Sequence, residues 1–220
     1  MKPKKKETIV VFAAHSDDQI IPIGGTIAKY AKEGRGVITV IFTQGGITTL
    51  RDHLYINIRK KEALKADKMI GVKKTIFLKI PETQLVKEAK NPKLMAKIKS
   101  IINKYKPDKI FTHTIYDIHH DHRAVHKIIT KAVDEIKGKK YSVYTFDVWD
   151  VAKTLNLLRK DTPKLLVDIS ETFEAKIKAI NLFKSQRFYT YRLLPYVYIN
   201  AITNGKKNNC KYAEVFYKIR

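Results

Sequence analysis

The stretch VVFAAHSDDQIIPIGGT, residues 10–26, decides how this chain folds. It opens with a continuous run of apolar and β-branched residues, which is typical of a strand buried on both faces of a sheet. The run ends abruptly at His15, and a Ser-Asp-Asp sequence follows directly. A helical pattern begins at the two glycines and stops at Gly34. The stretch therefore predicts a strand, a polar turn and a helix, which together form the first unit of an α/β fold.

The alternation of strand and helix patterns continues to the end of the chain. Further apolar runs predict strands at VITVIF, TIFLKI, DKIFTHT, YSVYTF, PKLLVDIS and YAEVFYKI. A long helical pattern runs from about His53 to Ile70 and ends at Gly71, a natural C-cap residue. Such units favour a Rossmann-like, open and mostly parallel sheet with helices on both faces. Because no linker interrupts them, we expect a single domain over 1–220, with a flexible basic segment at 1–7.

The net charge is strongly positive. The chain has 44 Lys and Arg residues against 21 acidic residues, a formal charge of +23. Clustered lysines bind nucleic acid and other polyanions, but here lysine is spread along almost every predicted helix. Abundant lysine is also typical of proteins from heat-loving organisms. We prefer a solvated, heat-adapted surface with no nucleic-acid partner, and polyanion binding is the alternative.

Several function classes are disfavoured by what the sequence lacks. The longest apolar runs are too short to span a bilayer, and no secretory apolar segment follows the basic N-terminus. We therefore expect a cytoplasmic protein without a membrane span. The single cysteine, Cys210, lies among Lys and Asn residues and cannot form an internal disulfide. These neighbours do not supply the basic partner that a thiol nucleophile needs.

Two polar motifs follow predicted strands. HSDD, residues 15–18, follows the first strand, and FTHTIYDIHHDHRAVH, residues 111–126, covers the end of the fourth and holds five of the seven histidines. Each motif alone also fits a polar turn in which an aspartate caps a helix. The carboxyl ends of parallel strands meet at one edge, however, where ligands bind. Imidazole and carboxylate groups suit zinc, so the two motifs together favour a shared metal site.

The motifs AHSDDQ, GGT and HHDHRAV resemble those of the zinc-dependent de-N-acetylases that include N-acetylglucosaminyl-phosphatidylinositol deacetylase and the LmbE-like proteins. Members of this family carry a His-Pro-Asp-Asp-Glu element followed much later by His-x-Asp-His. The resemblance continues in order along nearly the whole chain, through RKKEALKADKMIGV, FLKIPETQL, KPDKIFTH, VDISETFEAKIKAINLFKSQ and YAEVFYKI.

The resemblance implies a metal site made of His15, Asp18 and His122. Zinc is the metal that the family uses, although two histidines and an aspartate also accommodate other divalent ions. The family pattern further implies that Asp17 is the general base. It makes a protonated His119 the group that stabilises the oxyanion, and Asp121 the carboxylate that orients His119.

The activity that the resemblance implies is removal of the acetyl group from an N-acetylated amino sugar of the N-acetylglucosamine type, giving acetate and a free amine. The expected partners are this small molecule and further copies of the chain. Two alternatives stay open: a basic binding protein for nucleic acid or another polyanion, and a hydrolase of a different amide or ester at the same zinc site.

The sequence departs from the family pattern at two positions. Ser16 replaces the usual proline, which removes no chemical group. Gln19 replaces the usual glutamate, a more serious change. Because the family's acid at this position is not one of the matched ligands, we expect altered support around the metal and no loss of the metal itself.

Substrate contacts are less well specified. The resemblance makes Arg59 a contact for substrate hydroxyls, but its spacing from Glu62 also fits a helix-surface ion pair. Gly45, in the TQGG sequence after the second strand, is a candidate for the pocket lining and also fits an ordinary glycine turn. Gly24 and Gly25 fit either close approach of a substrate or packing against the sheet.

Two further features of the sequence have a plain interpretation. His126 lies one helical turn beyond His122, and we expect it to be packed or exposed and not to bind metal. The segment SQRFYTYRLLPYVY, rich in Tyr and Arg, is interpreted as core or subunit interface.

Overall fold

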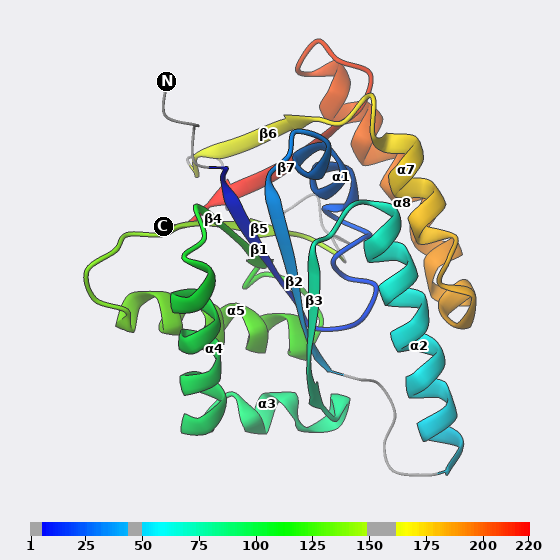
Figure 1. Cartoon of the computed structure of the whole chain (residues 1–220). Coiled ribbons are helices and arrows are strands. Elements are labelled where there is room, and N and C mark those ends of the chain that lie inside the picture. The colour runs from blue at the N-terminus through cyan, green and yellow to red at the C-terminus, as the bar shows by residue number, and fades with distance from the viewer. Residues whose placement is uncertain (1–5, 44–49, 149–161) are drawn as a thin grey trace.

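The computed structural model describes residues 6–43, 50–148 and 162–220 (Figure 1). These residues form seven strands, seven α-helices and two short 3-10 helices. In chain order they are β1 (Thr8–Ala13), α1 (Gly24–Lys32), β2 (Gly36–Thr43), α2 (Leu50–Met69), β3 (Lys74–Ile80), η1 (Glu82–Gln84), α3 (Leu85–Glu88), α4 (Pro92–Tyr105), β4 (Lys109–His113), α5 (His120–Glu135), β5 (Ser142–Phe146), β6 (Lys164–Asp168), α7 (Phe173–Ile180), η2 (Lys184–Gln186), α8 (Arg187–Lys206) and β7 (Ala213–Lys218).

All seven strands belong to one sheet in the order β3-β2-β1-β4-β5-β7-β6. The pairs from β3 to β5 are parallel, whereas β7 runs antiparallel to both of its neighbours. The prediction of an open, mostly parallel α/β sheet is therefore confirmed.

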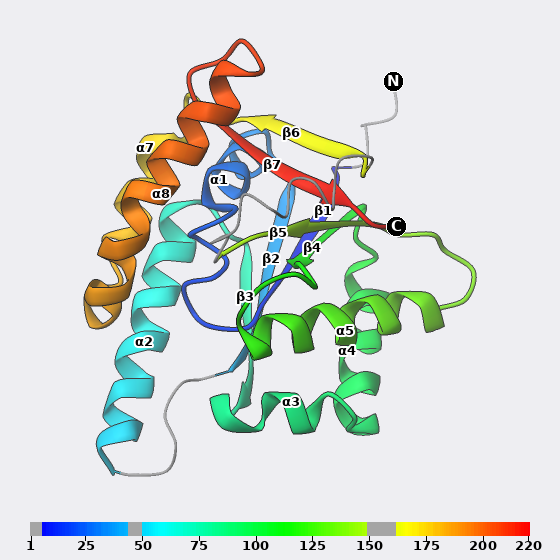
Figure 2. The same ribbon diagram turned by 180° about the vertical axis from the view of Figure 1, so that it is seen from behind.

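Helices cover both faces of this sheet, and each face has its own core. Successive residues of β1 point to opposite sides, as the pleat of a strand requires. Ile9 and Val11 belong to the core beneath α1, α2, α7 and α8. Val10 and Phe12 belong to the core beneath α3, α4 and α5. The two groups of helices lie on opposite sides of the sheet in both views (Figures 1 and 2).

The strand order reverses between β1 and β4. The chain leaves β1 toward β2 and β3, and then crosses to β4 on the other side of β1. The chain continues from β1 to α1 on one face of the sheet and from β4 to α5 on the other, and the carboxyl edge at such a reversal is the usual ligand site of these folds. Both polar motifs of the sequence lie at this reversal.

The glycine pair at the start of α1 serves packing. A Cβ atom on Gly25 would lie 2.6 Å from Ile169 Cδ1. The Glu214 carboxylate accepts hydrogen bonds from the backbone N–H groups of Gly25 (3.1 Å) and Thr26 (2.7 Å). It also accepts one from Lys176 Nζ (2.7 Å). This helix N-terminus is thus capped from within the protein.

Two further segments of the sequence have a defined place in the structure. Of the Tyr- and Arg-rich segment, residues 187–198 lie in the 20-residue helix α8, which includes Pro195, and the two residues before them end η2. Leu193 of this helix packs into the core, whereas Phe188 and Ile199 are exposed. At the N-terminus residues 1–5 lie outside the described residues, but Glu7 pairs with Lys109 at 3.0 Å.

Candidate metal and active site

The turn after β1 is held at both ends by hydrogen bonds. The Ala14 N–H donates to His113 Nε2 at 2.9 Å, which ties the turn to the end of β4. The His15 N–H donates to Asp18 Oδ2 at 2.8 Å. The Asp17 carbonyl accepts from Ile20 N–H at 2.9 Å. The side chains of this turn are thereby held over the reversal in the sheet.

The three residues expected to bind metal come together there. His15 Nδ1 lies 3.0 Å from Asp18 Oδ2. His122 Nε2 lies 3.2 Å from the same oxygen and 3.3 Å from His15 Nδ1. Ligands at about 2.0–2.1 Å from a tetrahedral zinc ion are about 3.3–3.4 Å apart. The three donor atoms therefore form a triangle close to the size that a zinc ion requires.

Each of the two histidines is backed by a carboxylate on its other ring nitrogen. His122 Nδ1 lies 2.9 Å from Asp117 Oδ2, and His15 Nε2 lies 3.3 Å from Asp121 Oδ2. Metal-binding histidines in general use such a partner to fix the ring orientation and to raise ligand basicity. The sequence assigned no role to Asp117, although its place among the clustered histidines was a usable signal.

The carboxylates make this cluster favourable for positive charge. Burial alone would lower the pKa of both histidines, but Asp18 and its neighbours outweigh it. They raise the pKa of His15 to about 10 and that of His122 to about 9. Burial would raise the pKa of Asp18, but His122 and His15 hold it well below its usual range. The donor set therefore matches what a buried divalent cation needs.

His113 is close to this cluster but has a different role. Its Nε2 lies 3.4 Å from Asp18 Oδ2. That nitrogen already accepts the Ala14 N–H, so its lone pair is not free for a metal. Burial and the charge of His122 hold the pKa of His113 well below its ordinary value, so the ring is neutral. His113 therefore stabilises the turn that carries His15.

The two groups expected to act on the substrate differ in exposure. Asp17 is buried, and its burial together with the charge of Asp18 raises its pKa. His119 is exposed and caps the N-terminus of α5, where its Nδ1 accepts the Asp121 N–H at 3.2 Å. The ring proton of His119 is thereby assigned to Nε2. The Asp121 carboxylate contacts His15, so its expected role in orienting His119 stays a prediction.

Gln19 lies outside the cluster of donor atoms. It is fully buried, and its amide donates to Asp67 Oδ1 at 3.2 Å. Asp67 also accepts hydrogen bonds from the hydroxyls of Thr39 and Thr75, each at 2.6 Å. Its pKa is raised by burial. An amide at position 19 thus gives this buried carboxyl a donor, where a glutamate would place a second acid beside it.

Arg59 lies beside the turn but does not form the ion pair that its spacing suggested. Its Nη1 donates to Glu82 Oε1 at 2.7 Å, while Glu62 accepts from the Ser185 N–H at 2.9 Å. Burial would lower the pKa of Arg59, but the charges of Asp17 and Glu82 outweigh this effect and raise that pKa. Gly45, the other expected substrate contact, lies outside the described residues.

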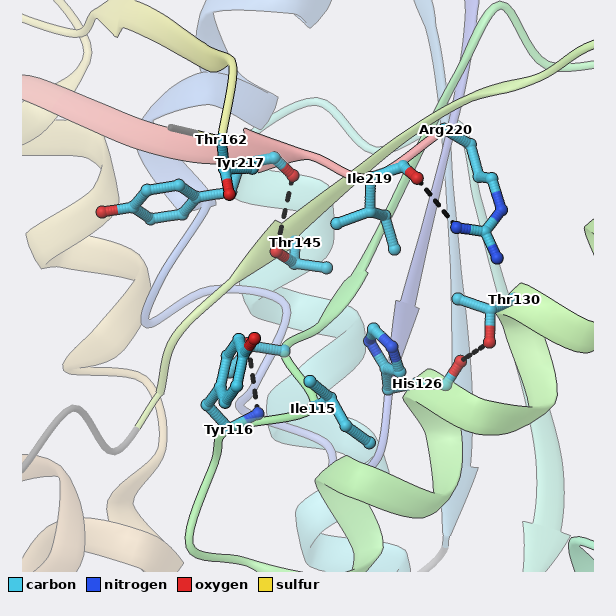
Figure 3. Close-up of a pocket in the computed structure, with 10 residues that line it drawn as sticks. Ile115, Tyr116, His126, Thr130, Thr145, Thr162, Tyr217, Ile219 and Arg220 are labelled. Carbon is cyan, nitrogen blue, oxygen red and sulfur yellow. Dashed lines mark hydrogen bonds between the residues drawn. The ribbon is translucent and has the colours of Figure 1, made fainter. Parts of the chain in front are cut away.

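His126 lies away from the donor cluster. Its Nδ1 is 2.9 Å from the His113 carbonyl oxygen, and its ring lines a cavity of about 220 Å³ together with Thr130 and Arg220 (Figure 3). None of the residues predicted to bind metal or act in catalysis lines this cavity. His120, next to His119, is exposed and contacts Arg123 at 2.7 Å.

Comparison with known proteins identifies the family. Residues 10–133 match the family model described as PIG-L, GlcNAc-PI de-N-acetylase. The chain belongs to the GlcNAc-PI de-N-acetylase family. This confirms the resemblance of the two motifs and the prediction of an enzyme, a hydrolase of the de-N-acetylase class. The match covers both motifs and most of α5, the helix that carries His122.

The chain is similar to proteins named as deacetylases over most of its length. It is 26% identical over 219 residues to the diacetylchitobiose deacetylase of Thermococcus kodakarensis, covering 94% of this chain and 80% of that protein. The N,N'-diacetylchitobiose deacetylase of Pyrococcus horikoshii, solved with an inhibitor, has a TM-score of 0.80 and 24% identity, covering 98% of this chain and 85% of that one.

The same fold also occurs in an enzyme named for a different reaction. The 4-carboxy-2-hydroxymuconate hydratase of Pseudomonas putida has a TM-score of 0.78 and 18% identity, covering 97% of this chain and 96% of that one. These structural similarities establish the fold alone, so the substrate must be argued from the site.

Proposed function

We propose that this family member is a zinc-dependent hydrolase that removes the acetyl group from an N-acetylated amino sugar of the N-acetylglucosamine type. The observation that carries the proposal is the triangle of donor atoms from His15, Asp18 and His122, with sides of 3.0, 3.2 and 3.3 Å. The names of the relatives, which are diacetylchitobiose deacetylases, support the substrate class. Another divalent ion is compatible with the same donors.

The three donors would hold the metal and leave one position of a tetrahedral site open. A bound zinc ion supplies a Lewis acid and brings the pKa of a coordinated water to about 7. Asp117 and Asp121 would keep the two histidine rings in orientation. Gln19 touches none of the three donors and stabilises the neighbouring Asp67, so we infer that the departure at this position leaves the metal site intact.

Asp17 is the proposed general base. It takes a proton from the attacking water as the water oxygen forms a bond to the acetamide carbonyl carbon. The raised pKa of Asp17 brings its basicity closer to the value that this transfer needs. When the carbon–nitrogen bond breaks, the same proton passes to the departing nitrogen. The products are acetate and a free amine.

His119 is the proposed donor to the oxyanion. Because its Nδ1 accepts the Asp121 N–H, its Nε2–H is free to donate to the negative oxygen of the tetrahedral intermediate. A donor of this kind contributes about 3–4 kcal/mol of transition-state stabilisation. The sequence predicts a protonated His119, but burial and the charge of His15 lower the pKa of this ring, so that prediction is wrong. The proposed role needs only the proton on Nε2, which the neutral ring carries.

Release of acetate tests the proposal. Zinc-loaded protein is incubated with N-acetylglucosamine and its short oligomers, beside His122→Ala as the inactive reference. We expect acetate from at least one acetamido sugar with the wild type and none with the variant. Confirmed metal content without turnover of any acetamido sugar would contradict the substrate class and leave hydrolysis of another amide or ester.

Polyanion binding is the competing function, and the charge of +23 is its motivation. Salt-dependent binding of duplex or single-stranded nucleic acid that His15→Ala leaves unchanged would favour it.

The proposal further places the enzyme in the cytoplasm, as an assembly of identical copies. Among the described helices, none combines the length and the apolar character that a membrane crossing needs.

A further inference from the structure

The loop between β4 and α5 carries two groups of the proposed site, and it contains neither helix nor strand. Asp117 Oδ2 lies 2.9 Å from His122 Nδ1. The ring centre of His119 lies 4.7 Å from that of His122 and 4.8 Å from that of His15. Only Ile118 separates Asp117 from His119, so the two peptide groups between them determine where both side chains lie.

Both of these peptide groups are held by one side chain, that of Arg123. This residue lies in the first turn of α5 and directly follows His122. Its Nη1 donates to the Asp117 carbonyl oxygen at 2.6 Å and to the Ile118 carbonyl oxygen at 2.7 Å. These two carbonyls belong to the peptide groups that join Asp117 to His119. A single guanidinium group of the helix therefore fixes the segment that carries both side chains.

The guanidinium group is itself held in place. Its Nη2 lies 2.7 Å from His120 Nδ1. Arginine has no acceptor atom, so Nη2 donates and the His120 nitrogen accepts. Because the guanidinium is planar and its donors form a rigid fork, a hydrogen bond at one nitrogen restricts the direction of the other. The contact with His120 thus keeps Nη1 directed at the loop.

The backbone N–H groups of this segment make more local hydrogen bonds. Asp117 Oδ1 accepts the His119 N–H at 2.9 Å, and His119 Nδ1 accepts the Asp121 N–H at 3.2 Å. Each of these bonds joins residues two apart in the sequence and shapes the turn. The two bonds from the Arg123 side chain span six and five residues and tie the turn to the helix.

The contribution of Arg123 to stability should be small. Ile118 is 60% exposed, and the hydrogen bond to its carbonyl lies at the surface. A carbonyl of an exposed loop can accept a hydrogen bond from water instead, so the exchange of water for a guanidinium group brings little net free energy. Water does not, however, hold the two peptide groups in one orientation. The arginine therefore serves the geometry of the loop more than the stability of the fold.

We propose that Arg123 is a positioning residue of the metal and active site. Its guanidinium group keeps the Asp117 carboxylate on His122 and the His119 ring beside His15, and it acts through these residues. The inference rests on the proposed function. Loss of a group that orients metal ligands typically costs about 10–100-fold in metal affinity or activity.

Zinc affinity, measured by competition with a chelator of known strength, tests this role. Arg123→Met keeps the length of the side chain and removes its donors, and we expect it to weaken zinc binding by about tenfold. In the Asp117→Asn background the same change should cost little further affinity, because both substitutions act through the His122 ring and such effects are not additive. An unchanged affinity, or equal losses from Arg123→Met in the two backgrounds, would overturn the proposal.

Lys127→Met is the matched control. Lys127 is exposed one turn further along the same helix, and its replacement removes the same charge. Zinc affinity should stay at the wild-type value, and the urea midpoint of unfolding should be nearly the same for both methionine variants. A loss of affinity equal to that of Arg123→Met would assign the effect to charge and overturn the proposal. If Arg123→Met does not fold, Arg123→Gln takes its place in every comparison.

The kinetic effect should be a lower kcat. At saturating zinc, Arg123→Met should lower the kcat for acetate release by about 10–100-fold and leave KM nearly unchanged. A displaced His119 weakens stabilisation of the oxyanion, which forms only after the substrate has bound. A rise in KM with an unchanged kcat would contradict a positioning role.

Failure of the proposed function would look different. If no acetamido sugar yields acetate, the zinc affinities still decide the role of Arg123. If the wild type binds no zinc, hydrogen exchange decides it. The His119 amide, which donates to Asp117, should then exchange faster in Arg123→Met than in the wild type and in Lys127→Met. Equal exchange rates in all three proteins would overturn the proposal.

Discussion

Two buried charged clusters begin helices in this protein, and they are built in opposite ways. At the start of α1, Glu214 receives the Lys176 ammonium and two backbone N–H groups, and both side chains are only 4% exposed. At the start of α5, His122 and its neighbours direct three donor atoms at a common point. The first cluster is satisfied internally and supports the fold. The second brings three possible ligand atoms together and is the proposed metal site.

The largest expected effect separates chemistry from metal binding within the second cluster. Asp17→Asn should lower kcat by about 100–10,000-fold, because an amide cannot take the proton from the attacking water. The donor atoms are untouched, so the metal content should equal that of the wild type. Both quantities are measured on the same preparation. Full activity of this variant together with bound metal would show that Asp17 is not the general base.

A substitution in the first cluster should lower the free energy of unfolding and leave metal binding unchanged. Glu214→Gln leaves the buried Lys176 ammonium without its counter-charge, which costs about 3–5 kcal/mol when one partner of a buried pair is removed. The free energy of unfolding is measured by urea denaturation, and metal content by elemental analysis. A variant that lost its metal but kept its stability would erase the distinction between the two clusters.

Asp117→Asn tests whether the Asp117 carboxylate orients the His122 ring. It replaces the carboxylate that lies 2.9 Å from His122 Nδ1, and such changes typically cost 10–100-fold in metal affinity. The affinity is measured by competition with a chelator of known strength. An unchanged affinity would mean that the His122 ring is held by packing alone.

The smallest expected effect concerns the buried carboxyl that Gln19 contacts. Thr39→Val removes a 2.6 Å hydrogen bond to Asp67 and should destabilise the protein by about 1–3 kcal/mol at neutral pH. The bond favours the charged carboxylate, so its loss raises the already raised pKa of Asp67 further. Because the unfolded chain titrates in the same way in both proteins, the difference between them appears where the folded Asp67 ionises. The destabilisation should therefore be small while Asp67 is protonated and should grow as pH rises through its raised pKa, above the ordinary value of about 3.9.

Thr26→Val is the matched control for this change. Thr26 is also fully buried, but its hydroxyl has no hydrogen-bond partner among the described residues. Its replacement should leave the free energy of unfolding unchanged or slightly higher at every pH. Equal pH profiles for the two valine variants, measured by urea denaturation between pH 4 and pH 8, would rule out the role assigned to Asp67.

The two clusters also differ in how far the sequence predicts them. The apolar run of β1 and the strand-end positions of both motifs are local patterns, and they were enough to indicate the sheet and the candidate donors. Glu214 lies 189 residues from Gly25, and nothing in its surroundings in the sequence indicates a helix cap. Partners so distant in sequence are set by the register of the sheet, which no local pattern encodes.

Contacts around the site were hidden for similar reasons. The i,i+3 spacing of Arg59 and Glu62 predicts an ion pair on a helix surface, but Arg59 is buried and pairs with Glu82, 23 residues along the chain. Gln19 departs from the family pattern, and its partner Asp67, 48 residues along the chain, is not indicated by any local pattern. Residue types and spacing predict which side chains are suited to a metal, whereas their support depends on tertiary packing.

The central claim is that His122 completes a metal site with His15 and Asp18. The most direct measurement is the zinc content per chain of purified wild type beside His122→Ala, with His120→Ala as the matched control on the same helix. We predict about one zinc per chain in the wild type and in the His120 variant, and a large loss in the His122 variant. Equal zinc in all three proteins would contradict the account.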